Sequence, residues 1–149
     1  MSFKAKKGFS VRTADWSADS EAIRSVRRVV FIEEQHVYPR EEWDGLDPLC
    51  DQFLAEDDRG NAIGTARLSA GGKLGRMAVV KQWRGRGVGA ALIKVVVELA
   101  RGKGIARLEA DAQVRALDFY ARQGFSVYGP EFLDARIVHR KVCMDIPNN

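Results

Sequence analysis

A run of arginines and glycines in the middle of the chain has the residue types needed to bind an anion. It reads Arg84-Gly85-Arg86-Gly87-Val88-Gly89, and it separates an apolar segment at residues 77–80 from an apolar helix pattern that begins at Gly87. Backbone N–H groups at a helix N-terminus are unpaired and carry the positive end of the helix dipole, and glycines let the backbone approach a ligand closely. Two arginines add positive charge, so the run predicts a phosphate-binding turn.

This turn can be compared with the known phosphate-binding patterns. The P-loop pattern G-x-x-x-x-G-K-[ST] does not occur in the chain. The dinucleotide pattern G-x-G-x-x-G/A is matched by Gly85, Gly87 and Ala90, with Glu109 and Asp111 about 20 residues further on. That pattern normally opens a βαβ unit, whereas three antiparallel-type strand patterns precede the run and 60 residues follow it. The pattern Arg-x-x-Gly-x-Gly fits without that conflict, and a glycine-rich helix entry without a ligand is the remaining alternative.

The composition predicts one folded domain over residues 1–149. Hydrophobic residues make up 46% and charged residues 30% of the chain, which is enough apolar material for a core. No stretch approaches the roughly 18 consecutive apolar residues of a membrane span, and the basic N-terminus lacks the apolar region of a secretory signal. We therefore expect a cytoplasmic protein in which Cys50 and Cys143 are free thiols, and these cysteines and the two histidines, His36 and His139, show no metal-binding spacing.

Charge is distributed unevenly along the chain, although the net charge is only +4. Between residues 41 and 58 there are eight acids and no Lys or Arg, and between residues 59 and 97 there are eight cations and no acid. Such runs are often simply two solvated surfaces. Because the cationic run contains the glycine turn, the alternative is that one half of the molecule binds an anion and the other half accepts a cation.

The spacing of apolar residues predicts an α+β fold with one mixed, mostly antiparallel, twisted sheet flanked by helices. The predicted order is a strand at 9–13, a helix from about 15 to 31, an irregular segment at 35–48, strands at 51–56, 62–69 and 74–80, a helix at 87–101, a strand at 105–110, a helix at 114–123, and strands at 125–128 and 137–146. In this order the glycine turn follows three hairpin-connected strands and opens the clearest helix of the chain.

The motifs and their order resemble those of the GNAT (Gcn5-related N-acetyltransferase) superfamily over nearly the whole chain. The run from Arg84 to Gly89 resembles its coenzyme A pyrophosphate loop, and residues 116–125 resemble its second signature, A-x-x-F-Y-x-x-x-G-F. Residues 30–35, 44–47, 132–134 and 137–139 are similar to the ElaA/YjcF-like bacterial subgroup. A Gly-Ile-Pro-His run is usual near the end of that subgroup, where this chain has Arg136 and Val138 in place of the glycine and the proline.

The resemblance implies an acyl-CoA N-acyltransferase fold and direct transfer of acetyl from acetyl-CoA to a primary amine, with no acyl-enzyme and no metal. Tyr120 matches the position that donates a proton to the coenzyme A thiolate, and a phenol, with a pKa of about 10, is a neutral donor at pH 7. A side chain at Gly87 or Gly89 is expected to occupy the place of the phosphate. The cofactor-binding residues implied by the resemblance are Met77, Ala78, Val79, Arg84, Gly85, Arg86, Gly87, Val88 and Gly89.

The general base is left open by the residues and by the resemblance. The candidates, acting directly or through water, are Glu34, Glu109, Asp111 and His139. Glu34 ranks first because its segment leads into the irregular loop that borders the acceptor site in this fold. His139 is expected on the strand face opposite Val138 and Val142, so it is also compatible with a simple surface position.

Acids near the expected acceptor site predict a small-molecule amine that carries positive charge. These acids are Glu33, Glu34 and those at residues 41–47. Two other functions are compatible with the motifs: a non-catalytic acyl-CoA-binding sensor and a nucleotide-dependent oxidoreductase. A nucleic-acid partner is disfavoured by the net charge of +4 and by the lack of an aromatic–basic recognition motif, and no membrane partner is expected. Many members of the superfamily are dimers, so a homodimer stays open.

Overall fold

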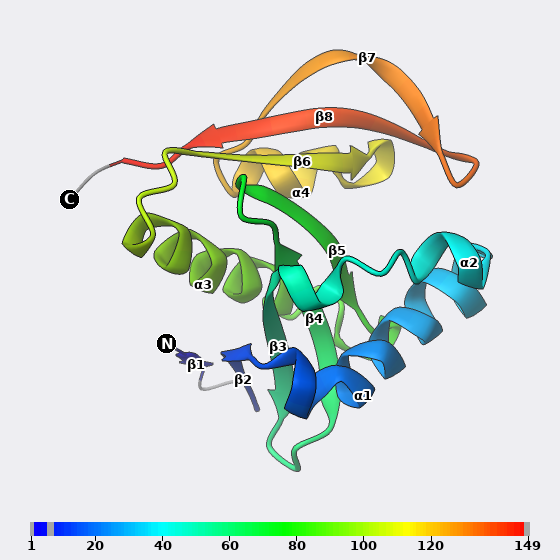
Figure 1. Cartoon of the computed structure of the whole chain (residues 1–149), viewed down its shortest axis with the longest axis vertical. Coiled ribbons are helices and arrows are strands. Elements are labelled where there is room, and N and C mark those ends of the chain that lie inside the picture. Colours follow the sequence, from blue (N-terminus) through cyan, green and yellow to red (C-terminus); the bar gives the residue numbers. More distant parts are fainter. Residues whose placement is uncertain (1, 6–7, 148–149) are drawn as a thin grey trace.

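A computed structural model describes residues 2–5 and 8–147, and an eight-stranded sheet runs through them (Figure 1). All neighbouring strands are antiparallel except β5 and β6, which are parallel, so the predicted mixed, mostly antiparallel α+β fold is confirmed. The strands lie in the order β1 (Ser2–Ala5), β2 (Phe9–Ala14), β3 (Asp51–Asp57), β4 (Ala62–Leu68), β5 (Lys73–Val79), β6 (Arg107–Gln113), β8 (Ile137–Asp145) and β7 (Ser126–Asp134).

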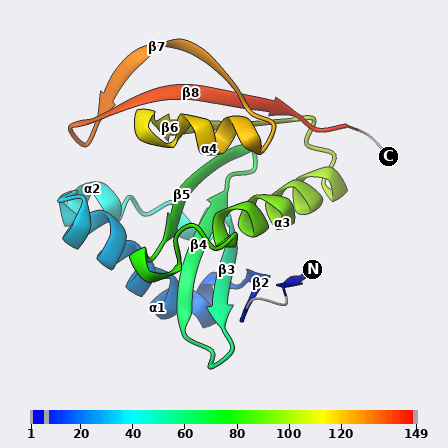
Figure 2. The same cartoon turned by 180° about the vertical axis from the view of Figure 1, so that it is seen from behind.

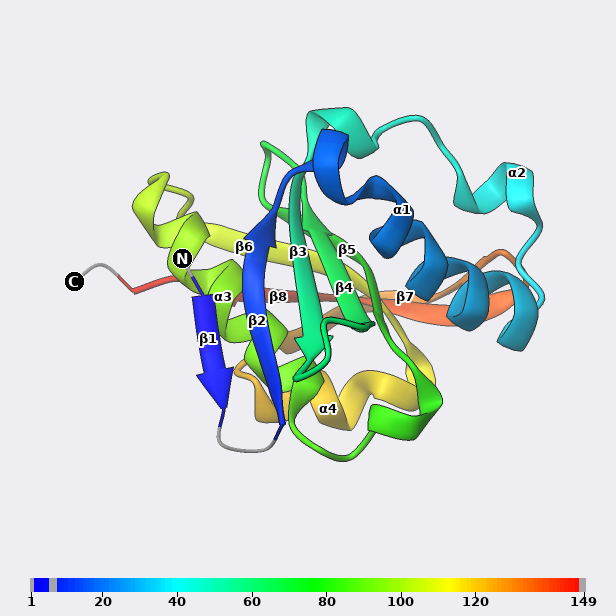
Figure 3. The ribbon, with the colours of Figure 1, turned by 90° about the horizontal axis from the view of Figure 1, so that it is seen from below.

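Helices cover both faces of this sheet. Figure 3 shows α1 (Trp16–Arg27) and α2 (Pro39–Glu42) on one face, with α3 (Val88–Gly102) and α4 (Leu117–Arg122) on the other. Seen from behind, α3 runs between the β2–β4 half and the β6–β8 half of the sheet (Figure 2). Because α3 has neighbours on both sides, it is buried over more than one stripe. Its buried side chains are Val88, Ala91, Leu92, Ile93, Val95, Val96 and Ala100.

Several element bounds differ from the predicted ones. The first helix is α-helical only to Arg27 and then continues as a π-helical segment, η1 (Arg28–Glu34), a wider winding that apolar periodicity does not reveal. The predicted irregular segment contains α2 and a 3-10 turn, η2 (Asp47–Leu49). A further 3-10 turn, η4 (Val114–Ala116), precedes α4. The short edge strand β1 was not predicted, because it has only four residues, the shortest length over which alternation indicates a strand.

The sheet opens between its two parallel strands. β5 and β6 are paired at only two positions, Lys73 with Glu109 and Leu74 with Ala110. Beyond them the register between β4 and β5 shifts by one residue, and Arg76 has a φ of 49°. A bulge of this kind bends its strand and increases the local twist. β5 therefore diverges from β6, and the backbone of its last residues has no strand neighbour on that side.

Candidate active site

A cleft of about 770 Å³ lies where β5 and β6 diverge. Segments from the whole chain line it: η1 and the loop after it, β5, β6, α4 and β8. The chemistry-bearing side chains among its lining residues include Arg84, Asp111, Gln113, Tyr120 and His139. Residues that the sequence separates by more than 50 positions are therefore brought to one opening.

The unpaired backbone of β5 faces this cleft. Val80 N–H donates to Ile63 O of β4 at 2.9 Å, and backbone groups alternate in direction along a strand. Ala78 therefore also turns its backbone toward β4, whereas Met77 and Val79 turn theirs toward the divergence. The backbone of Met77 and the N–H of Val79 are thus geometrically available for the predicted main-chain binding. Val79 O accepts a hydrogen bond from Arg84 Nε, and Ala78 contributes strand pairing instead. An extended ligand with amide groups could pair here much as an added strand does.

The glycine turn follows β5 and a 3-10 turn, η3 (Lys81–Trp83). Gly85 and Gly87 have φ values of 74° and 89°, a left-handed conformation that favours glycine. A Cβ atom added at either residue would meet no atom within 4 Å, so space lies open above the turn. α3 begins directly after it without a side-chain cap, which leaves its first N–H groups available to an anion.

Gly89 has a different role from the one expected. A Cβ atom there would lie 3.0 Å from Phe119 Cζ and 3.2 Å from Met77 Cε. Gly89 thus lets α3 pack closely against α4 and β5, and the expectation that its side chain would occupy the place of a phosphate is wrong. Phe119 was not predicted as a site residue, although it stands in the Phe-Tyr signature next to Tyr120.

The two arginines of the turn point to different partners. Arg84 donates from both terminal nitrogens to the Glu34 carboxylate, at 2.6 and 2.7 Å, and from Nε to Val79 O at 2.9 Å. These hydrogen bonds lower the pKa of Glu34 and raise that of Arg84. Arg86 instead stacks on the Trp83 ring, with its guanidinium carbon 3.8 Å from the ring centroid. Arg84 thus links η1 to the glycine turn through its ion pair with Glu34. Arg86 is the arginine of the turn that is available to an anion.

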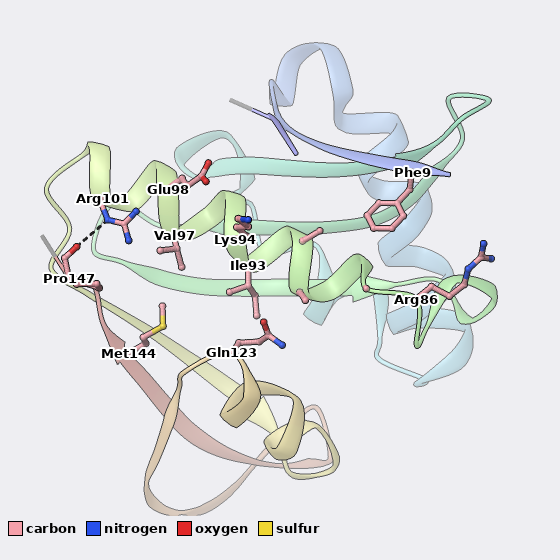
Figure 4. A pocket seen from close by; sticks show the side chains of 13 residues that line it. Phe9, Arg86, Ile93, Lys94, Val97, Glu98, Arg101, Gln123, Met144 and Pro147 are labelled. Carbon is pink, nitrogen blue, oxygen red and sulfur yellow. Dashed lines mark hydrogen bonds between the residues drawn. The ribbon is translucent and has the colours of Figure 1, made fainter. Parts of the chain in front are cut away.

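A second groove, of about 630 Å³, runs along α3 and meets the glycine turn at one end (Figure 4). Arg86 and Gly87 line that end, and Arg101, which donates to Pro147 O at 3.1 Å, lines the other. Apolar side chains, Ile93 and Met144 among them, line the part between. The glycine turn therefore lies between this groove and the cleft, so one elongated ligand could extend from one into the other.

Tyr120 projects from α4 into a largely apolar environment. It is 9% exposed, and its ring makes edge contacts with Phe119 and Phe125 at centroid distances of 5.3 and 5.4 Å. Its hydroxyl donates to Met77 Sδ at 3.9 Å. Burial raises the pKa of Tyr120 to about 12, so the phenol stays protonated at neutral pH. The hydroxyl is thus a neutral donor that already faces a sulfur atom.

His139 lies in the cleft and not on the surface. It is 8% exposed and stacks on Phe132 at 5.7 Å, whereas its neighbour Val138 is 40% exposed. The alternative of a simple surface histidine is wrong, because Phe132 of β7 covers the ring on this edge of the sheet. Nδ1 lies 2.7 Å from Ile137 O, and a carbonyl can only accept, so we assign the proton to Nδ1. In the neutral ring, Nε2 then carries the lone pair.

The carboxylates considered as general bases are all held by cations. Glu34 is paired with Arg84, and Glu109 lies 3.5 Å from Arg107 and does not line the cleft. Asp111 is contacted by Lys73 at 2.8 Å and by Lys141 at 3.3 Å. Burial raises the pKa of Asp111. The hydrogen bond from Lys73 and the charges of the two lysines lower it by a larger amount, so the pKa of Asp111 lies below its ordinary value. The geometry therefore favours His139 over the carboxylates, including Glu34.

The acidic segment at residues 41–47 is neutralised within the molecule. Arg27, which is fully buried, contacts both Glu42 and Asp47, and Arg67 contacts both Asp44 and Asp47. Other ion pairs join Glu41 to Arg136 and Asp44 to Arg76. These acids hold the loop in place, so the electrostatic argument for a cationic acceptor loses its basis. Sequence could not show this, because the arginines come from four distant segments.

Within the described part of the chain, no helix is long and apolar enough to cross a membrane. In the same ranges, residues 2–5 and 8–147, no three His, Cys, Asp or Glu side chains gather as metal ligands would. Cys50 and Cys143 are free, as predicted.

The solved structure of an acyl-CoA N-acyltransferase from Pseudomonas aeruginosa has the same fold, with a TM-score of 0.80 and 23% identity over 91% of this chain and 99% of that one. Residues 32–145 match the family model of the acetyltransferase (GNAT) domain, and the chain belongs to this family. It is an acetyl-CoA-dependent N-acetyltransferase. The antiparallel strands β3–β5 before the turn also differ from the βαβ unit that a dinucleotide oxidoreductase would need.

One sequence relative agrees with this assignment, and two further solved structures share the fold. YjcF of Bacillus subtilis, which is named as an uncharacterized N-acetyltransferase, is 35% identical over 123 residues, which cover 80% of this chain and 88% of YjcF. A Lactobacillus plantarum protein described as an N-acetyltransferase has a similar structure, with a TM-score of 0.85 and 23% identity over 94% of this chain and 99% of that one. Escherichia coli ElaA has a TM-score of 0.81 and 20% identity over 91% of this chain and 99% of its own. The resemblance to the ElaA/YjcF-like subgroup is thus confirmed.

Proposed function

We propose that this enzyme transfers an acetyl group directly from acetyl-CoA to the primary amine of a small molecule bound in the cleft. The observation that carries the proposal is that the unpaired backbone of β5, the Tyr120 hydroxyl and the His139 ring line the same cleft. The cofactor's pyrophosphate would lie on the turn from Gly85 to Gly89, with Arg86 beside it. Its nucleotide would extend toward the groove along α3, and its pantetheine amides would pair with the backbone of Met77 and Val79.

In this scheme His139 is the general base and Tyr120 the general acid. His139 Nε2 takes a proton from the acceptor's ammonium group, and the freed amine nitrogen attacks the thioester carbonyl carbon. The C–S bond then breaks, and the Tyr120 hydroxyl hydrogen-bonds to the sulfur and donates a proton to it. The amide nitrogen loses its second proton, which restores the phenol through solvent, and His139 releases the proton it took to solvent. Because the side chains of Tyr120 and His139 are both nearly buried, they act in surroundings of low dielectric constant.

We propose that the acceptor is a compact amine. The reaction requires no charged group on it other than the ammonium group that becomes acetylated. Five acids and five Lys or Arg residues line the cleft, so its lining has no marked excess of either sign. The free thiols Cys50 and Cys143 are compatible with the reducing cytoplasm, where we place the enzyme.

Thiol release from acetyl-CoA tests the proposal. The enzyme is mixed with acetyl-CoA and, one at a time, an amino-acid amide, an amino sugar, an aliphatic polyamine and an aromatic amine. Release that depends on the amine and yields the N-acetyl product by mass spectrometry supports direct transfer. A radiolabelled acetyl group that stays on the protein in the absence of amine would contradict it. Tight acetyl-CoA binding without release for any amine would instead support the acyl-CoA sensor.

A further inference from the structure

The tip of the β7–β8 hairpin is fastened to the segment before α2. Arg136 donates to the Glu41 carboxylate from both terminal nitrogens, at 3.0 and 3.2 Å, and to His36 O at 3.3 Å. Its guanidinium carbon also lies 4.0 Å from the centroid of the Tyr38 ring. A single side chain thus joins two segments that are about a hundred positions apart in the sequence, and we call these contacts of Arg136 the clasp.

The turn that carries Arg136 is unfavourable for its own residues. Ala135 and Arg136 form the two-residue connection between Asp134 and Ile137, with φ values of 48° and 66°. Two-residue hairpins of this conformation favour Asn-Gly or Gly-Gly, because side chains crowd the backbone at positive φ. Strain of this kind persists where other contacts hold it, and here the clasp supplies those contacts. Local turn preference alone would not place an arginine at this position.

The clasp lies at the border of the acceptor cleft. Val37 and Glu41 on one side, and Asp134, Ala135 and Ile137 on the other, are all lining residues of that cleft. An ion pair between partly exposed side chains contributes little stability by itself. Here one guanidinium forms a bidentate ion pair with Glu41, donates to the carbonyl of His36 and stacks on the ring of Tyr38. The two segments are thus held together at this side of the cleft.

We infer that Arg136 determines acceptor specificity, by closing this side of the cleft against polypeptide chains and leaving room for compact amines. The inference rests on the proposed function. It predicts that the enzyme distinguishes two acceptors with the same amine by the length of chain behind that amine. Alaninamide and penta-alanine are such a pair, since both present an alanine α-amine.

Two glycine variants separate the clasp from the strain of the turn. Arg136→Gly removes the guanidinium and relieves one left-handed residue, whereas Ala135→Gly relieves the neighbouring left-handed residue and keeps the guanidinium. Both variants are expected to fold, because glycine is favoured at both positions. In Glu41→Gln the ion pair is lost, yet the side-chain oxygen can still accept from the Tyr38 N–H as it does now at 3.0 Å.

Two measurements test the inference. Hydrogen exchange of the amides of residues 36–42 should be about tenfold faster in Arg136→Gly than in Ala135→Gly, because only the first loses the clasp. The ratio of kcat/KM for penta-alanine over alaninamide should rise about tenfold in Arg136→Gly and less than about twofold in Ala135→Gly. In Glu41→Gln the rise should lie between these two values, because Arg136 keeps its contacts with His36 O and the Tyr38 ring.

Each other outcome overturns a defined part of the argument. Equal exchange in the two glycine variants would show that the clasp does not hold the segment. Faster exchange with an unchanged acceptor ratio, or wild-type enzyme that uses both acceptors equally well, would remove Arg136 from specificity. If no amine of any kind causes thiol release, the proposed transfer itself fails, and the exchange measurement still decides whether the clasp exists.

Discussion

The hydroxyl of Tyr120 donates to the sulfur of Met77 at 3.9 Å, where α4 packs against β5. A thioether is a weak acceptor, so this nearly buried hydroxyl is held in place without being strongly engaged. It can therefore turn to the more negative sulfur that develops as a thioester C–S bond breaks. Gly89, beside Met77 and Phe119, makes room for this arrangement.

Replacing Tyr120 by phenylalanine should reduce kcat by roughly 10²–10⁴-fold, the range expected for loss of a general acid. Acetyl-CoA affinity should change little, because the hydroxyl acts mainly in the transition state. Calorimetry and steady-state kinetics measure the two quantities separately. Tyr128→Phe, on β7, is the matched control. Turnover close to wild type in Tyr120→Phe, with the chemical step shown to limit the rate, would remove Tyr120 from the mechanism.

His139 and Glu34 make opposite predictions for the pH profile. A base must be unprotonated, so kcat/KM for the acceptor should rise with pH in the wild type. His139→Gln should lower kcat by roughly 10²-fold or more and leave only the rise that follows ionisation of the acceptor's own ammonium group. Glu34→Gln should keep the rise and change mainly the KM for acetyl-CoA, because it releases Arg84 from its ion pair. The reverse pattern would assign the base to Glu34.

Gly87 should be required for acetyl-CoA binding beyond its effect on stability. Alanine at its φ of 89° is strained by roughly 1–2 kcal/mol, and its methyl group would project into the open space above the turn. Gly60→Ala, at a φ of 82° with equally open surroundings, is the matched control in the β3–β4 turn. Both variants should lose similar stability in urea, and only Gly87→Ala should lose acetyl-CoA affinity. Equal affinity of Gly87→Ala and Gly60→Ala for acetyl-CoA would show that the pyrophosphate does not bind at the glycine turn.

Stability toward acid should depend on Asp44. The hydrogen bond from Arg67 holds the pKa of Asp44 well below its ordinary value of 3.8. A carboxyl whose pKa is lowered by folding stabilises the protein above the unfolded pKa and loses that effect as the pH falls through the folded value. Asp44→Asn should therefore be destabilised by a constant amount above about pH 5. The difference should shrink below pH 3.8, as urea unfolding at several pH values would show.

Asp58→Asn, at an exposed position in the β3–β4 turn, is the control for that series. Its unfolding free energy should follow the wild type across the same range of pH. A difference between Asp44→Asn and the wild type that does not vary with pH would mean that the Asp44 charge contributes no stability.

Local patterns were enough to predict the element order and the glycine turn. Alternation located β3 to β5, and the apolar spacing from Val88 to Leu99 located α3, because each pattern reports burial over a few neighbouring residues. The same reasoning failed where the helix type of a segment or the burial of a residue depends on contacts with residues distant in the sequence. Examples are the π-helical segment at Arg28–Glu34 and the burial of His139 under Phe132.

The sequence by itself determined the family, the glycine turn and the presence of Tyr120 in the Phe-Tyr signature, since these depend on residue types at fixed short spacings. Only the tertiary structure decided how the charges are used. Arg84 meets Glu34 across 50 positions, and Arg136 meets Glu41 across 95. Ion pairs of this kind form wherever the fold brings opposite charges within a few ångströms, and no local pattern encodes that proximity. For this reason a segment that reads as an acidic binding surface is, in the folded protein, already occupied by the protein's own arginines.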